Sequence, residues 1–179
     1  MAAGDIDAIA AALSHAEGYT FSDEERATAF ALDTLRRDLA PFAEGPLPGG
    51  LVAEHAGALA GFLLYLHRTL ADPYPPGHFI PRLPASHFPA DGRFLQIHEL
   101  WVAPGQRRRG LATALKRAAE VVAIDAGAGA ILTVTEATHA AALRLNAALG
   151  YRAIYQGPMW DAVPRVALIK ALPTGADAP

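Results

Sequence analysis

The chain of 179 residues contains no cysteine, which excludes disulfides, thiolate metal sites and a cysteine acyl-enzyme. Charged residues make up only 18% and the formal net charge is −3, which argues against a general nucleic-acid-binding or membrane-binding surface. No apolar stretch approaches about 20 residues, and no basic segment followed by a long apolar run opens the chain. We therefore expect neither a membrane span nor a signal peptide, and take a cytoplasmic location as the default.

Hydrophobic residues make up 52% of the chain, ample material for a core. The length suits one compact domain, which we predict over residues 1–172, with a flexible tail over residues 173–179. We find no internal repeat.

Hydrophobic periodicity and turn residues predict a mixture of helices and strands. Asp5 can cap a first helix that runs to about His15, and a capping box of Ser22 and Glu25 predicts a second helix to about Leu39. A short turn at Ala56 and Gly57 predicts a hairpin between the first two strands. The remaining predicted elements are strands over residues 51–55, 59–67, 94–102, 130–135, 151–156 and 165–171, and helices over residues 111–126 and 138–149.

A basic, glycine-containing turn links the predicted strand 94–102 to the following helix. The turn reads Gln106, Arg107, Arg108, Arg109, Gly110, Leu111, Ala112. Unpaired N–H groups and the helix dipole make such a helix start a binding place for phosphates. Gly110 lets a pyrophosphate approach the backbone without a Cβ in the way, and the arginines neutralise its charge. The alternative is that the arginines are solvated surface charges.

One better-known phosphate loop can be excluded. Gly105 and Gly110 have the spacing of a nucleotide-hydrolysing loop. Leu111 and Ala112 stand where that loop needs a lysine and a serine or threonine, so nucleotide hydrolysis is not expected.

The turn instead resembles the acyl-CoA loop of the GCN5-related N-acetyltransferase (GNAT) superfamily. That pattern is Gln or Arg, two residues, Gly, one residue, then Gly or Ala. The matching residues are Arg107, Gly110 and Ala112. Residues 99–104 resemble the strand that leads into the loop, and residues 142–151 resemble the next helix and strand start. The likeness covers roughly residues 5–172.

The resemblance implies an α/β (α+β) fold, with a mixed, mostly antiparallel central sheet flanked by helices. Its first strand is expected to be missing or very short, because only residues 1–4 precede the first helix. It also implies transfer of an acetyl group from acetyl-CoA, the cosubstrate, to a primary amine in a ternary complex. The acceptor would be a small molecule or a peptide, no metal is expected, and the uncovered sheet edge favours a homodimer.

The resemblance also assigns binding residues. A backbone N–H near Leu100 to Val102 would stabilise the carbonyl oxygen, and the turn would hold the pyrophosphate. The residues expected to bind acetyl-CoA are Leu100, Trp101, Val102, Arg107, Arg108, Arg109, Gly110, Leu111, Ala112, Thr113, His139 and Asn146.

Two residues are candidates for catalysis. Glu99 occupies the position of a frequent family glutamate and would act as the base, alone or through water; the alternative is an ion-pairing or substrate-orienting carboxylate. Neighbouring His98 should point to the opposite face of the strand. Asn146 stands where the family commonly has a tyrosine that donates to the leaving sulfur, and an amide cannot deliver a proton as a tyrosine does. His139 stands seven residues before Asn146, and this spacing of two helical turns predicts both side chains on one face. One hypothesis is that His139 binds CoA while water or Tyr151 assists the sulfur; the alternative is that the thiolate leaves unaided.

Residues 68–93 contain six prolines and no clear periodicity, a longer connection than is usual. Its aromatic rings either line an acceptor pocket or pack beneath a proline-rich flap. The rings are His78, Phe79, His87 and Phe88. A metal site that also used His67 has no support from the spacing.

Two rival functions stay open. One is a catalytically inactive CoA-binding sensor or interaction protein, motivated by Asn146 and the missing first strand. The other is an acyltransferase that uses a longer acyl-CoA, whose chain the residues 68–93 would enclose.

Overall fold

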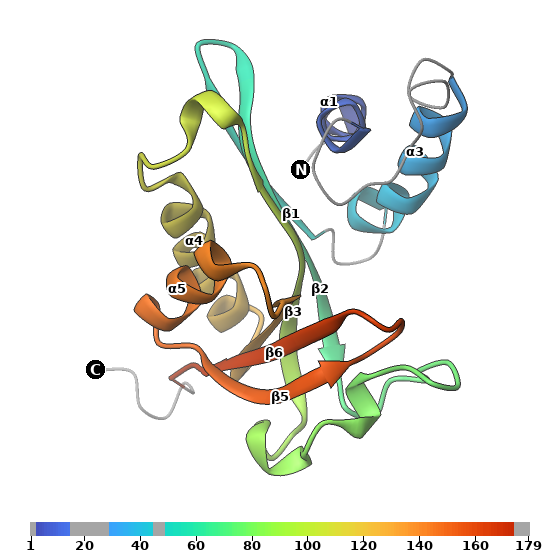
Figure 1. The fold of residues 1–179 in the computed structure, drawn as a ribbon, viewed down its shortest axis with the longest axis vertical. Coiled ribbons are helices and arrows are strands. Elements are labelled where there is room, and N and C mark those ends of the chain that lie inside the picture. The colour runs from blue at the N-terminus through green and yellow to red at the C-terminus, as the bar shows by residue number, and fades with distance from the viewer. Residues whose placement is uncertain (1–2, 15–28, 45–48, 174–179) are drawn as a thin grey trace. The chain divides into compact units, whose positions relative to one another are not determined.

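The computed structural model describes residues 3–14, 29–44 and 49–173, which form helices and strands (Figure 1). These residues divide into two compact units, one of residues 1–65 and 99–115 and the other of residues 66–98 and 116–179. The helices are α1 (Ala3–Ser14), α3 (Ala29–Glu44), α4 (Leu111–Asp125) and α5 (Ala140–Ala148). The strands are β1 (Gly50–His55), β2 (Ala58–Thr69), β3 (Arg93–Val102), β4 (Ala130–Glu136), β5 (Arg152–Pro158) and β6 (Pro164–Ala171).

The six described strands hydrogen-bond in the order β1-β2-β3-β4-β6-β5. β1 pairs with β2, β4 with β6 and β5 with β6 in antiparallel fashion, whereas β3 and β4 are parallel. This mixed, mostly antiparallel sheet confirms the predicted fold class. The two segments described before β1 are helical, so the first described strand begins at Gly50.

The predicted hairpin is confirmed. β1 and β2 close at His55 opposite Ala58. Ala56 and Gly57, between them, have φ values of 52° and 75°. Two residues with positive φ make the tight turn whose twist matches that of antiparallel strands.

The first unit packs α1 against α3, and an ion pair of 2.7 Å joins Asp7 to Arg36 (Figure 1). α1 begins at Ala3, so the predicted cap at Asp5 is wrong. Asp5 lies inside the first turn, where the interaction of a carboxylate with the helix dipole stabilises the helix. The predicted capping box of Ser22 and Glu25 lies outside the described residues.

The predicted end of the second helix at Leu39 is also wrong, because α3 continues to Glu44 through Pro41. Leu35, Leu39 and Phe42 follow one another at helical spacing and are all buried. Burial of this apolar stripe favours another turn of helix, although proline removes one backbone donor.

The second unit contains the proline-rich connection, which is not structureless. It forms two short 3₁₀ turns, Ile80–Arg82 and Ala85–His87. Its side chains join a core with those of the strands. This core consists of Phe79, Ile80, Leu83, Phe88, Phe94, Ala130, Leu132, Met159, Ala167 and Ile169. The interpretation that the phenylalanine rings pack beneath the flap is confirmed.

The two histidines of the connection also contact neighbouring side chains. His78 stacks between Tyr74 and Phe79, with ring centroids 4.8 and 5.0 Å away. His87 Nδ1 lies 3.0 Å from an Arg152 guanidinium nitrogen. The connection is therefore held by stacking and polar contacts as well as by its phenylalanines.

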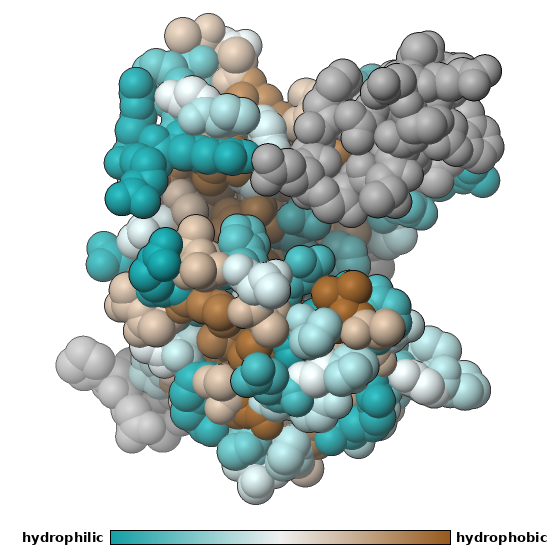
Figure 2. Space-filling view, viewed as in Figure 1, coloured by the Kyte–Doolittle hydropathy of each residue, from teal (hydrophilic) through white to brown (hydrophobic). Residues whose placement is uncertain are grey.

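On the face shown in Figure 2, hydrophobic residues reach the surface in separate patches among hydrophilic ones. Among the described residues, the exposed large hydrophobic side chains are Val121, Ile124, Trp160 and Val163. None of the helices that the structure describes is long and apolar enough to cross a bilayer.

Candidate functional site

The arginine-rich turn of the first unit has the backbone of an anion-binding loop. Arg108 and Gly110 both have positive φ, 64° and 83°. The first bond along α4 runs from the Ala114 N–H to the Gly110 carbonyl (3.0 Å), so the N–H groups of residues 111–113 have no acceptor inside the helix. A Cβ on Gly110 would meet nothing within 4 Å, so the space above the turn is open. Such a loop can hold a phosphate, because residues with a left-handed backbone precede helical N–H groups that have no acceptor inside the helix.

The arginine side chains of the turn are all exposed. The Arg107 Nε donates to the Val102 carbonyl (3.1 Å), and an Arg109 guanidinium nitrogen donates to Gln106 Oε1 (3.3 Å). These bonds orient two guanidinium groups while leaving other N–H donors for a ligand. The turn also borders a pocket of about 280 Å³, whose lining residues are Glu54, His55, Ala60, Gln106, Arg109, Gly110, Leu111 and Ala114.

Glu99 is half-buried on β3, and its neighbour His98 is exposed, in line with opposite faces of the strand. Burial raises the pKa of the Glu99 carboxyl, and the Leu100 N–H, which donates to Glu99 Oε1 at 3.3 Å, partly opposes this rise. A carboxylate with a raised pKa accepts a proton more readily than an exposed one.

The end of β3 extends beyond its ladder with β4. Parallel pairs join Leu95–Ile97 to Ile131–Thr133, and β3 continues to Val102. The backbone of Leu100–Val102, predicted to stabilise the carbonyl oxygen, therefore lies outside this paired register. The Trp101 ring stacks on Phe62, with centroids 5.6 Å apart, which holds this part of the strand.

Asn146 and His139 lie in the second unit and have different environments. Asn146 is only 3% exposed, and within the described part of the chain its Oδ1 has no hydrogen-bond partner. His139 is exposed and precedes α5 as its N-cap, with ψ at 72°. The helical spacing used to place both side chains on one face therefore does not apply, because His139 is not in the helix.

Sequence reasoning missed Lys116, which follows the loop on α4. It is 2% exposed, and its Nζ lies 4.4 Å from the centroid of the Tyr151 ring. Burial lowers the pKa of Lys116 to about 7. The signal was in the sequence: Lys116 shares a helical stripe with Ala119 and Ala123, both fully buried, so a lysine stands in an apolar face.

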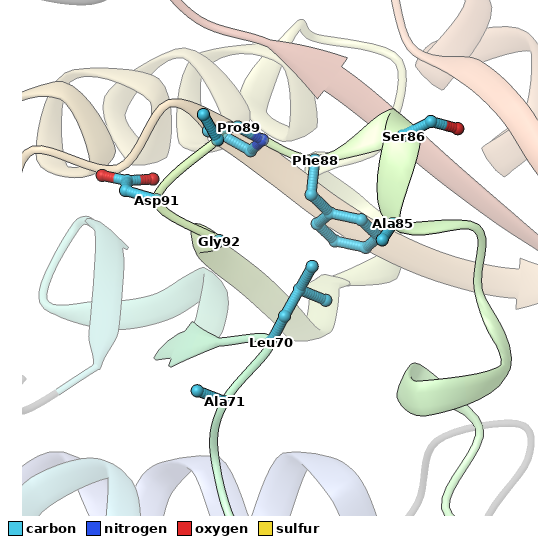
Figure 3. Close-up of a pocket in the computed structure, with 9 residues that line it drawn as sticks. Leu70, Ala71, Ala85, Ser86, Phe88, Pro89, Asp91 and Gly92 are labelled. Atoms are coloured by element: carbon cyan, nitrogen blue, oxygen red, sulfur yellow. The ribbon is translucent and has the colours of Figure 1, made fainter.

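A larger pocket, of about 520 Å³, lies in the second unit (Figure 3). The side chains of Leu70 and Phe88 point toward each other there, whereas the polar ends of Ser86 and Asp91 point away (Figure 3). Phe88, one of the rings considered for an acceptor pocket, lines this pocket, whereas none of the predicted catalytic or acetyl-CoA-binding residues does. The described residues include no group of three or more histidine, aspartate or glutamate side chains that could hold a metal ion.

Comparisons with known proteins agree with the predicted fold. The sequence model of the acetyltransferase (GNAT) family matches residues 9–151. No curated protein matches the chain significantly.

Solved structures share the fold at low sequence identity. Naa20 from Chaetomium thermophilum, in complex with a bisubstrate analogue, has a TM-score of 0.65 and 18% identity over 95% of this chain and 83% of that one. The ribosomal-protein-S18-alanine N-acetyltransferase from Escherichia coli has a TM-score of 0.64 and 14% identity over 98% and 94%. NAA60 from Arabidopsis thaliana, in complex with acetyl-CoA, has a TM-score of 0.65 and 13% identity over 94% and 95%.

Proposed function

Because the chain belongs to the acetyltransferase (GNAT) family, we propose that it transfers an acetyl group from acetyl-CoA to a primary amine by direct transfer in a ternary complex. The observation that carries the proposal is the turn before α4, where Arg108 and Gly110 have a left-handed backbone and the first helical N–H groups have no acceptor inside the helix. This geometry suits the pyrophosphate of CoA. Arg107 and Arg109 add charge that a pyrophosphate needs.

Glu99 is the proposed base. Its raised pKa makes it a better proton acceptor than an exposed carboxylate, and a proton lost by the attacking amine can reach it directly or through water. The backbone N–H groups of Leu100–Val102 would stabilise the negative oxygen of the tetrahedral intermediate. Attack of the amine on the thioester carbonyl forms the new C–N bond and this intermediate, whose collapse breaks the C–S bond so that CoA leaves as a thiolate.

We place Asn146 at the leaving sulfur, where its amide can hydrogen-bond a thiolate without protonating it. The buried Oδ1 has no hydrogen-bond partner among the residues that the structure describes, which supports a polar role for Asn146, because an apolar residue would suit the site better if it were only packing. The proposed acceptor is an amine of a small molecule or a peptide. Naa20 and NAA60, which share the fold, were solved with a bisubstrate analogue and with acetyl-CoA, respectively.

The test is calorimetric titration of acetyl-CoA into the wild type and into an Arg107→Ala/Arg109→Ala double variant. We expect micromolar binding that weakens at least tenfold in the variant and falls with added salt, because exposed arginines act mainly through charge. The matched control is Arg117→Ala, an exposed arginine on α4 that lies outside the turn. Absence of binding by folded wild type would refute the proposal.

Turnover with a panel of amines, followed by release of the free thiol, then separates the rival functions. A sensor would bind acetyl-CoA without any turnover. An enzyme for longer acyl chains would bind a long acyl-CoA more tightly than acetyl-CoA.

A further inference from the structure

Lys116 is the most deeply buried ammonium that the structure describes. It is 2% exposed, and among the described residues its Nζ has no hydrogen-bond partner. A charged group without a partner is costly in a protein interior. Lys116 therefore sits where small changes in the local field decide whether it carries a proton.

Three side chains lie around Lys116. Its Nζ lies 4.4 Å from the centroid of the Tyr151 ring, in the residue before β5, and the Nζ of Lys170 on β6 lies 6.0 Å from the same centroid. Glu120, one turn further along α4, holds Lys170 at 2.7 Å in an ion pair. The nearby carboxylate is thus already paired with the other lysine, while the ring face of Tyr151 attracts the charged form of Lys116.

Three effects set the pKa of Lys116. Burial lowers the pKa of Lys116 most, Glu120 raises it and Lys170 lowers it again, to about 7 in sum. At neutral pH the charged and neutral forms of Lys116 are therefore both populated. An added negative charge that acts on this residue shifts it toward the charged form.

α4 itself connects Lys116 to the proposed acetyl-CoA loop. The helix begins at Leu111, and Lys116 follows five residues later, about 7.5 Å along the helix axis. An anion held by the first turn would thus act on Lys116 over roughly 10 Å. At an effective dielectric constant near 20, one unit of charge at that distance changes a proton affinity by roughly tenfold.

We propose that binding of acetyl-CoA at the loop and protonation of Lys116 are linked, so that Lys116 takes up a proton when the anionic donor binds. This inference rests on the proposed function, because it needs the donor phosphates at the start of α4. By reciprocity, affinity for acetyl-CoA falls as the pH rises and Lys116 loses its proton. Lys116 then acts as a positioning residue that makes donor affinity dependent on pH.

The test is calorimetry of acetyl-CoA binding, without an acceptor amine, in two buffers of different ionisation enthalpy. The difference in heat gives the protons taken up. We expect the wild type to take up about half a proton more than Lys116→Met near pH 7.5. Between pH 7 and 9, wild-type affinity should fall up to about tenfold further than that of the variant. Subtracting the proton uptake of the variant from that of the wild type removes the contribution of the donor phosphates, which is common to both proteins.

Two further variants sharpen the result. Arg117→Met removes an exposed charge from the next position of α4 and should take up protons as the wild type does. Lys116→Gln provides a polar, uncharged replacement if Lys116→Met does not fold. Equal proton uptake by the wild type and the folded Lys116 variant overturns the linkage while leaving the proposed function intact. No binding by folded wild type overturns both.

Discussion

Replacing Lys116 by methionine should stabilise the protein, and the gain should depend on pH. Methionine has a similar length and no charge, so it can fill the same buried space beside Tyr151 without desolvating an ammonium. The folded protein holds the pKa of Lys116 at about 7, whereas the value for an unperturbed lysine is 10.5. Between these two pH values the unfolded chain binds a proton that the native protein lacks.

The sign of the effect follows from this difference. Because the unfolded chain binds more protons between pH 7 and 10.5, wild-type stability rises with pH over this window. Each pH unit contributes about 1.4 kcal/mol, so the wild type at pH 7 is less stable than at pH 10.5 by on the order of 5 kcal/mol from this residue. Lys116→Met removes this contribution, so its advantage is largest at or below pH 7 and disappears toward pH 10.5.

Urea unfolding of both proteins at pH 7, 8, 9 and 10 measures the effect. The variant's advantage in free energy of unfolding should shrink by about 1 kcal/mol for each pH unit. Arg117→Met is the matched control, since the exposed Arg117 should give a difference that does not vary with pH. The lowered pKa of Lys116 would be contradicted if the difference in free energy of unfolding did not vary with pH, or if the variant were less stable than the wild type at pH 7.

Three further predictions test other parts of the structure. Glu99→Gln should lower kcat about 100-fold or more and leave the affinity for acetyl-CoA unchanged. It should also abolish the rise in kcat that the wild type shows as the pH passes through the raised pKa of Glu99. An unchanged pH profile of kcat would argue for an orienting role. Gly61→Ala should cost about 1–3 kcal/mol in urea unfolding, because its Cβ would lie 2.9 Å from the Trp101 carbonyl oxygen; wild-type stability would show that β2 adjusts freely. Asn146→Leu should change the free energy of unfolding by no more than about 1 kcal/mol, because it removes a buried oxygen that has no hydrogen-bond partner among the described residues. The same variant should lower turnover, and full activity would show that Asn146 takes no part in the reaction.

The turn before α4 could be predicted because its determinants are local. A glycine with positive φ, a helix start and a run of arginines are all properties of consecutive residues. The hairpin at Ala56 and Gly57 was predictable for the same reason. The end of α3 was not, because the burial of Phe42 outweighs the local preference of Pro41 to end a helix.

The environments of the candidate site residues lay beyond local pattern. α5 begins one residue after His139, a boundary that helical spacing alone did not locate, and His139 is exposed whereas Asn146 is buried. The rings of residues 68–93 pack into a core supplied by strands far along the chain, such as Leu132 of β4 and Ile169 of β6.

The sequence by itself determined the order of helices and strands, the acyl-CoA-like loop and the position of Glu99 on its strand, because these depend on residues that are close neighbours in the chain. The lowered pKa of Lys116, in contrast, arises only in the folded protein. That lowering depends first on the exclusion of water from around the ammonium and then on charges such as that of Lys170, which β6 brings beside Glu120 of α4. A local helical pattern can indicate that Lys116 is buried, but it cannot encode the charges that distant elements bring around the ammonium.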